Sequence, residues 1–235
     1  MWVLYGILPP VIVIGLIIAV IVTVVQGRST GGMTFPGIML GYVYAAMFVS
    51  VFLFAAGASL LLKVGLAEAA GRDFAYRTEV EERFYPDDRL ATMVDPSDEA
   101  IPNDIATGIT LVFVGSALFA IHGTAAAGLR RRRAPGLRQI ARTYNLLGLA
   151  GSTILFLAGS GAAVYNTLRR YVLDPDKFEP WNYPRPGGAI GVAVIFLPVA
   201  LWFAWRVWQE FAEEVGGADK SGTAPTKEDV GAAVS

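Results

Sequence analysis

The side chain with the widest chemical range in this 235-residue sequence is its one histidine, His122, because the chain contains no cysteine. An ionisable group inside an apolar segment is a candidate proton relay, metal ligand or haem ligand. A b-type haem in a membrane usually takes two histidines, and a metal ion needs several donors, so a single histidine completes neither site. We therefore predict no bound cofactor and a neutral His122 that bonds a backbone carbonyl or a hydroxyl such as that of Thr124.

Sequence patterns typical of catalytic sites are absent as well. The chain has no glycine-rich phosphate loop, no nucleophile elbow and no HExxH pair, and no serine has a second histidine to activate it. We predict a protein without enzymatic activity.

A second group of polar side chains lies within one apolar stretch, residues 144–168, and includes Asn145, Ser152 and Ser160. These side chains suit two roles: they line a path for a small solute or ion, or they bond across helices and back to their own backbone. Transporter cores typically contain a buried acid or an interrupted helix near the bilayer midplane. No apolar stretch of this chain has a central Asp or Glu, so we favour the bonding role and keep transport as the alternative.

Charged residues are segregated along the chain, although the net charge is only −1. Residues 64–104 contain four arginines and eleven acids, whereas residues 130–142 contain six arginines and no acid. Because short loops rich in Lys and Arg stay in the cytoplasm, we expect the arginine-rich segment there and a solvated acidic loop outside, with Lys63 extending towards the outer headgroups. Four consecutive arginines are predicted to meet anionic lipid headgroups. They are Arg130, Arg131, Arg132 and Arg133.

The elements that must hold these residues are five apolar stretches. Each is close to the roughly 20 residues that a helix needs to cross a hydrocarbon core about 30 Å thick. We predict an all-α, polytopic transmembrane helix bundle over residues 1–215 in the cell membrane, with an extracytoplasmic N-terminus, followed by a disordered cytoplasmic tail over residues 216–235. The five predicted spans are residues 2–26, 38–63, 105–129, 144–168 and 188–207.

The acidic connection between the second and third spans is predicted to have two parts. The second span is expected to continue as helix over residues 66–82, since no proline interrupts that stretch. Residues 85–104 contain three prolines and indicate an irregular surface loop. Asn103 or Asp104 then supplies the N-cap of the third span.

Two pairs of spans share residues at fixed offsets. At an offset of 102 residues, the second and fourth spans share Tyr42/Tyr144, Ser50/Ser152, Phe54/Phe156, Ala56/Ala158 and Gly57/Gly159. At an offset of 83 residues, the third and fifth spans share Gly108/Gly191, Phe113/Phe196, Ala117/Ala200 and Leu118/Leu201. A duplication would give two parallel two-helix units related by an axis along the membrane normal. Apolar helices also share residues by chance, so both interpretations stay open.

Some of these motifs resemble a known family. The tyrosine-led second and fourth spans, the GSALFAIH pattern at Gly115–His122 and the LPVALWFAW pattern at Leu197–Trp205 are similar to DUF5671, a family of four-helix membrane domains. The resemblance covers roughly Ile38–Gln209 and implies a four-helix membrane core. It implies no activity and no functional residue. The long connection between the second and third spans departs from a compact version of that core.

Small residues recur every four positions on the third and fourth spans, as in Ala120, Thr124 and Gly128. Such stripes let helix backbones approach closely. They suit either packing inside the bundle, which we favour, or the seam of a homodimer.

The function class that these patterns favour is a scaffold or accessory subunit of the membrane. Its expected partners are the lipid bilayer, including anionic lipids, and a membrane protein or a second copy of the chain. No nucleic acid partner is expected. A small-solute or ion transporter that uses the polar face of the fourth span is the alternative.

Overall fold

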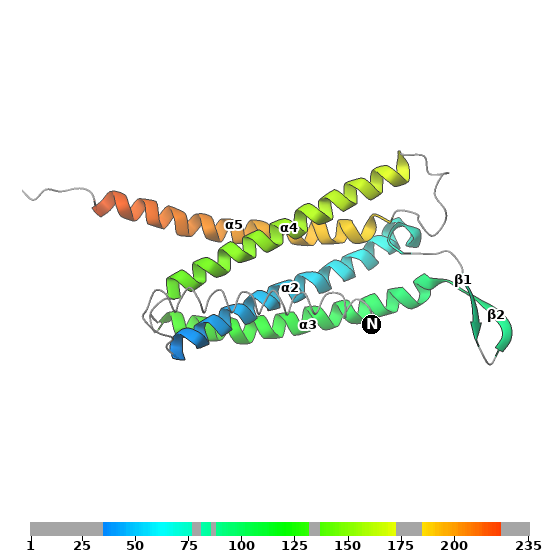
Figure 1. Ribbon diagram of the computed structural model, residues 1–235, viewed down its shortest axis with the longest axis horizontal. Coiled ribbons are helices and arrows are strands. Elements are labelled where there is room, and N and C mark those ends of the chain that lie inside the picture. The colour runs from blue at the N-terminus through cyan, green and yellow to red at the C-terminus, as the bar shows by residue number, and fades with distance from the viewer. Residues whose placement is uncertain (1–34, 77–80, 86–87, 132–136, 173–184, 222–235) are drawn as a thin grey trace, which may run out of the picture.

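Four long helices form most of the described structure. The computed structural model describes residues 35–76, 81–85, 88–131, 137–172 and 185–221. The helices are α2 (Phe35–Ala70), α3 (Pro96–Arg131), α4 (Leu137–Tyr171) and α5 (Gly187–Ser221). Between α2 and α3 lie a short 3-10 helix and two strands, which are η1 (Arg72–Phe74), β1 (Glu81–Tyr85) and β2 (Asp88–Val94). Figure 1 shows these elements coloured in chain order.

All four long helices are apolar and long enough to cross a membrane. The second to fifth predicted spans are therefore confirmed as helices of spanning length, while the predicted first span, residues 2–26, lies outside the described residues. Each helix has 35 or 36 residues. That length is about 53 Å, whereas a hydrocarbon core is about 30 Å thick. The helix ends consequently extend beyond an apolar layer of that thickness.

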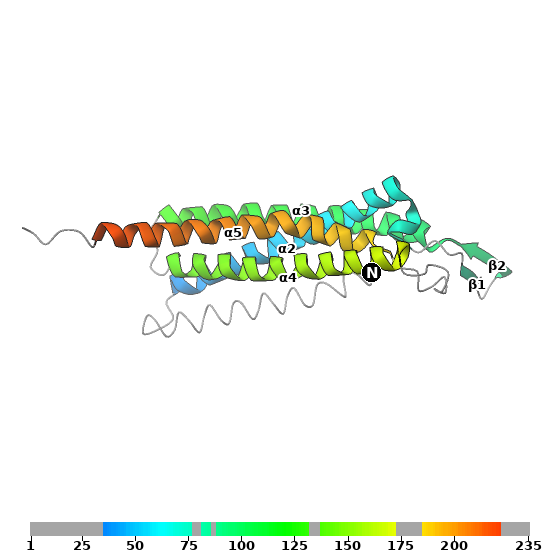
Figure 2. The same cartoon turned by 90° about the horizontal axis from the view of Figure 1, so that it is seen from above.

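The helices form two antiparallel pairs, α2 with α3 and α4 with α5, aligned with the long axis of the molecule (Figures 1 and 2). Helix α2 joins the pairs, because it packs against α5 and α4 as well as α3. In the most apolar part of α2, 39% of the residues are buried, against 17% in the corresponding parts of α3 and α4. The α2 sequence is apolar on all sides, which suits a central position.

An aromatic core lies between the two pairs. Phe52 of α2 and Phe196 of α5 have ring centroids 5.8 Å apart. Phe203 of α5 is fully buried and meets the ring of Tyr144 edge-on, at a centroid distance of 5.5 Å. On α4, the missing side chain of Gly148 leaves the room that the Phe203 ring occupies. Aromatic pairs of this kind add about 0.5–1.5 kcal/mol to the effect of burial alone.

Glycines set the close approach of α2 and α3. A Cβ atom on Gly115 of α3 would lie 2.7 Å from the backbone nitrogen of Phe54 and 2.8 Å from the carbonyl oxygen of Ser50. A Cβ atom on Gly57 of α2 would lie 2.7 Å from the carbonyl oxygen of Gly108. Since these neighbours are backbone atoms, any side chain at either position forces the helices apart.

Two glycines that the predicted repeat aligns have related surroundings. Gly57 packs against α3, and Gly159, 102 residues later, packs against α5, where an added Cβ atom would lie 2.9 Å from the nitrogen of Ala193. Another aligned pair differs, because Tyr42 is exposed and Tyr144 is buried. The repeat therefore stays a prediction.

The connection between α2 and α3 differs from the predicted one. We expected helix over residues 66–82, but α2 ends at Ala70, and the next residue, Gly71, has a φ of 97°. That conformation favours glycine and terminates helices. The predicted irregular loop over residues 85–104 is also wrong. Strands β1 and β2 pair as an antiparallel hairpin, and α3 has already begun at Pro96.

The start of α3 is capped earlier than predicted, by neither Asn103 nor Asp104. Asp95 precedes the helix, and its Oδ1 accepts a 2.8 Å hydrogen bond from the backbone N–H of Ser97, as an N-cap side chain does. Pro96 occupies the first helical position, where its missing N–H has no helical partner to lose. Asp104 is instead buried in the third turn of α3.

The end of α5 also differs from the prediction. The helix continues to Ser221, so residues 216–221 of the predicted disordered tail are helical. The remaining tail residues, 222–235, lie outside the described part of the chain. In Figure 1 the final turns of α5 project past the ends of the other three helices.

Candidate functional site

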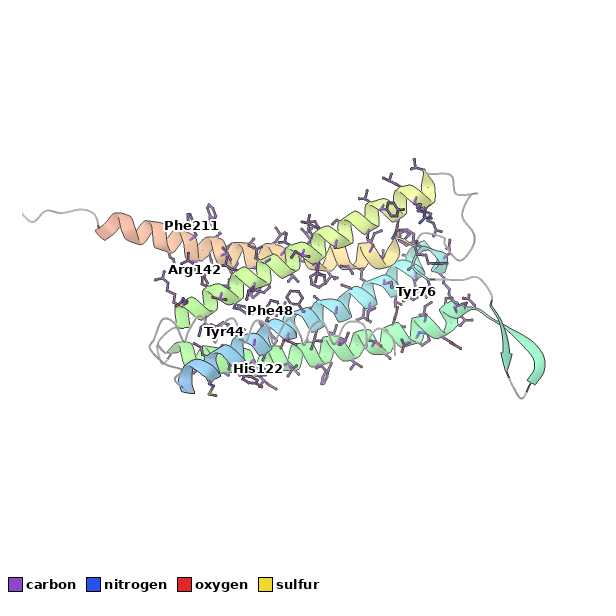
Figure 3. All side chains as sticks on the ribbon, viewed as in Figure 1. Tyr44, Phe48, Tyr76, His122, Arg142 and Phe211 are labelled. Carbon is purple, nitrogen blue, oxygen red and sulfur yellow. The ribbon has the colours of Figure 1, made fainter. Side chains whose placement is uncertain are left out.

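Charged side chains gather at the end of the bundle where α2 ends and α3 begins, near the Tyr76 label in Figure 3. Hydrogen bonds and ion pairs there join segments that are far apart in the sequence. We call this set the polar clamp. Its members are Lys63, Arg72, Asp73, Tyr76, Asp98, Asp104, Arg170 and Arg185.

The centre of the polar clamp is a buried ion pair between α2 and α3. Lys63 Nζ lies 2.8 Å from Asp104 Oδ2, and the two side chains are 23% and 7% exposed. Lys63 Nζ also lies 3.9 Å from the ring centroid of Tyr76, a cation–π distance. The Tyr76 hydroxyl donates a 2.9 Å hydrogen bond to the same Asp104 oxygen. Two donors thus compensate the buried carboxylate, as a buried charge requires.

The segment that follows α2 ties α3 and α4 into the polar clamp. Arg72 Nη1 donates to Asp98 Oδ1 at 2.7 Å, across an exposed surface. Arg170 of α4 binds Asp73 twice: Nη1 donates to the backbone carbonyl at 2.8 Å, and Nη2 pairs with the carboxylate. Arg170 is 10% exposed and its partner Asp73 is 57% exposed, against 51% and 64% for Arg72 and Asp98, so water screens the Arg170 pair somewhat less. We therefore expect Arg170 to contribute more to stability.

The start of α5 reaches the same segment. Arg185 Nε donates a 3.0 Å hydrogen bond to the backbone carbonyl of Tyr76. Gly187 lies against Ala75, since an added Cβ atom would be 2.6 Å from the Cβ of Ala75. Residues 71–76 therefore continue from α2 and contact α3, α4, Arg185 and Gly187, the first residue of α5. The polar clamp holds the two helix pairs together at this end.

The pKa of Tyr76 is raised well above its ordinary value. Burial is the largest cause, because it disfavours the charged phenolate, and the hydrogen bond to Asp104 and the charge of Asp104 add to it. The hydroxyl therefore stays protonated, and keeps donating to Asp104, in the alkaline range where a free tyrosine ionises.

We expect the contribution of Tyr76 to the free energy of unfolding to fall as the pH rises above about 10. The unfolded chain releases this proton near the ordinary tyrosine pKa, while the folded chain holds it, so the stabilisation is complete below that pH and falls above it. The advantage of the unsubstituted protein over Tyr76→Phe in free energy of unfolding should shrink steadily with rising pH. The phenolate absorbance difference between the two proteins follows Tyr76 itself, and ionisation together with the other tyrosines would contradict the prediction.

His122 lies towards the opposite end of α3 and is 9% exposed (Figure 3). Its Nδ1 is 2.8 Å from the carbonyl oxygen of Leu118, so Nδ1 carries the proton and donates. Nε2 lies 3.4 Å from the Tyr42 hydroxyl. The Thr124 hydroxyl instead donates to the carbonyl of Ile121. Each ring nitrogen of His122 therefore has a hydrogen-bond partner, one of them a backbone carbonyl as predicted.

The three polar candidates on α4 do not form one site. Asn145 is buried, and its Nδ2 donates to Glu210 Oε1 of α5 at 2.5 Å. Ser152 is fully buried, and its Oγ donates to the carbonyl of Gly148 at 2.6 Å. Ser160 is half-buried further along the helix. From Asn145 to Ser160 the helix rises about 22 Å, which is too far for these side chains to act on one small ligand.

The predicted lipid site lies at the end of α3. Arg130 and Arg131 form the last helical residues, and Arg132 and Arg133 lie outside the described residues. The headgroup contact of this run therefore stays a prediction. Within the described ranges, no group of three or more His, Cys, Asp or Glu side chains is placed to hold a metal ion.

Sequence reasoning missed the polar clamp. Lys63 was expected to extend towards headgroups and Asp104 to cap α3, yet the two residues, 41 positions apart, pair with each other. One signal for this pairing was present in the sequence. Each residue is a charge at the edge of an apolar stretch, and the two edges face the same side when consecutive spans run antiparallel. Glu210 was missed as the partner of Asn145 because it follows the predicted end of the fifth span.

Comparisons with family models, with curated proteins and with solved structures found no match. The resemblance to DUF5671 accordingly stays a prediction from the motifs quoted above.

Proposed function

We propose that this protein is a multi-pass integral membrane protein that serves as a non-enzymatic scaffold or accessory subunit. The observation that carries this proposal is how α4 uses its polar side chains. Asn145 donates to Glu210, and Ser152 donates to the carbonyl of Gly148. These bonds occupy the groups that a solute path would present to water. The four apolar helices are compatible with a membrane location.

The polar clamp supports the same proposal. Ionisable groups at membrane helices often belong to ion or proton pathways. Here the charges join helices instead: Lys63 of α2 pairs with Asp104 of α3, and Arg170 of α4 pairs with Asp73. Side chains that hold helices together maintain a fixed shape, which is what a scaffold needs.

The proposal includes five spans, with residues 2–26 as the first, an extracytoplasmic N-terminus and a cytoplasmic C-terminus. The charge segregation supports this orientation, because six arginines without an acid fall in residues 130–142. The polar clamp then lies on the outer side. The arginine run meets anionic lipids on the inner side, and the two-unit repeat and the likeness to DUF5671 belong to the same proposal.

A pair of substitutions on α4 separates a scaffold from a transporter. Asn145→Ala leaves the Glu210 carboxylate without its amide donor, which costs about 1–3 kcal/mol. We expect a lower unfolding midpoint in detergent for this variant and for Asn145→Ala/Ser152→Ala. We expect no change in glycerol, potassium or proton flux in proteoliposomes.

The matched control is Thr143→Ala, on the same helix, where an exposed hydroxyl bonds the carbonyl of Gln139. This variant should keep the unfolding midpoint of the unsubstituted protein. A measurable flux that the Asn145 and Ser152 substitutions abolish while stability is retained would establish the transporter instead.

A further inference from the structure

The face of α3 that points away from α2 has no extensive helical neighbour within the described part of the chain. Only α2 packs extensively against α3 there. Ile109, Phe113 and Ile121 are 56%, 73% and 62% exposed. On the same helix runs a line of exposed small residues, four positions apart: Ser116, Ala120, Thr124 and Gly128.

We propose that the apolar segment of residues 2–26 crosses the membrane against this exposed face of α3. The proposal rests on the proposed function, in which this segment is the first span. Residues 27–34 join the segment to α2, and eight residues reach at most about 28 Å. Helix α2 begins at the end of the bundle where α3 finishes (Figure 1), so this short connection keeps the segment close to α3.

The short connection over residues 27–34 also makes this segment a better candidate than a separate protein to cover the exposed face of α3. A short tether gives an effective concentration in the millimolar range without any new contact. If the segment crosses antiparallel to α2, it runs parallel to α3. Helices α4 and α5 also expose large apolar side chains, but each packs against two other long helices, whereas α3 packs extensively against α2 alone within the described residues.

The side chains of the segment fit the exposed face. Residues 11–25 are all Val, Ile or Leu except Gly15, Ala19 and Thr23. A helical segment would carry these three residues on one side, because they are four positions apart. Small residues facing small residues let two helix backbones approach closely in lipid.

In this placement the two lines of small residues come to the same depth. Thr23 stands five residues before Arg28, the first charged residue after the segment, and Thr124 stands six residues before Arg130. The other members keep the same spacing of four. If the two arginines mark the same membrane surface, each small residue is within about 1.5 Å of the height of its counterpart.

Disulfide cross-linking tests this placement, and the absence of native cysteine makes every introduced thiol unambiguous. The full chain carries Ala19→Cys and Ala120→Cys, with a protease site inserted between Gly31 and Gly32. After oxidation in the membrane and cleavage, the two fragments stay joined only if the cysteines are within disulfide range. We expect most chains to stay joined, at least ten-fold more than for the control pair Ala19→Cys/Ala150→Cys, whose second site is exposed on α4.

Three results would overturn the placement. Cross-linked dimers of the single variant Ala120→Cys would show that a second copy covers the face. Joining of Ala19→Cys to Ala150→Cys instead would place the segment on α4. Separation of all fragments, with Ala120→Cys open to a lipid-soluble maleimide, would show that lipid alone covers α3.

A second measurement keeps this proposal distinct from the proposed function. Val3→Cys should react with an impermeant maleimide added outside, whichever face the segment packs against. Labelling from outside without the cross-link rejects only the placement on α3. Labelling from inside alone rejects the first span and with it the proposed topology.

Discussion

Replacing Asp104 with alanine is expected to lower the free energy of unfolding by about 3 kcal/mol. The substitution leaves the half-buried ammonium of Lys63 at the α2–α3 contact without its carboxylate, and it removes the acceptor of the Tyr76 hydroxyl. An uncompensated buried charge is far more costly than a missing surface pair. Reversible unfolding in mixed detergent micelles, followed by circular dichroism, measures the loss.

Two further variants define what this loss means. Lys63→Met/Asp104→Leu removes both charges and fills their space with apolar atoms, so it should recover most of the lost stability. Arg72→Ala breaks the exposed pair with Asp98 and should change stability by less than about 1 kcal/mol. If Asp104→Ala proves no more harmful than Arg72→Ala, the buried pair does not hold α2 and α3 together.

Replacing Gly115 with alanine is expected to cost about 2 kcal/mol. The added methyl group would lie 2.7 Å from the nitrogen of Phe54 and 2.8 Å from the carbonyl oxygen of Ser50. Backbone atoms of a helix cannot rotate aside as a side chain can. The α2–α3 pair must therefore separate along its length, with loss of packing on both sides of the contact.

The matched control for this prediction is Gly123→Ala on the same helix, where an added Cβ meets nothing within 4 Å. Alanine is the better helix former by about 0.5–1 kcal/mol, so this variant should be equal to or more stable than the unsubstituted protein. The comparison uses the same change on the same helix in the same unfolding assay. Equal effects at the two positions would mean that the close approach at Gly115 does not limit the packing of α2 and α3.

The apolar helices were predictable because the length of an apolar stretch can be read from consecutive residues. A stretch of about 20 apolar residues has few options other than a helix in lipid, and the second to fifth stretches are helical. Helix ends were less predictable. The predicted helix continued past Gly71, but that residue adopts a positive φ. Glycine is compatible with both helical and left-handed backbone, so its presence in the sequence does not show which of the two it adopts.

For the candidate site, too, some features could be predicted from the sequence and others could not. The sequence by itself determined which residues are polar within apolar stretches, and Asn145, Ser152 and His122 are such residues. It did not determine their partners. Glu210 lies 65 residues from Asn145, and this pairing depends on how α4 and α5 pack.

What the amino-acid sequence determined, then, is the number and apolar character of the four long helices in the described part of the chain, since each contains a contiguous run of apolar residues. Only the tertiary structure decided that α2 is the central helix, and that Lys63 and Asp104 form one buried pair with Tyr76. The physical reason is that an ion pair requires two atoms within a few ångströms. Residues 41 positions apart reach that distance only after the helices that carry them have packed.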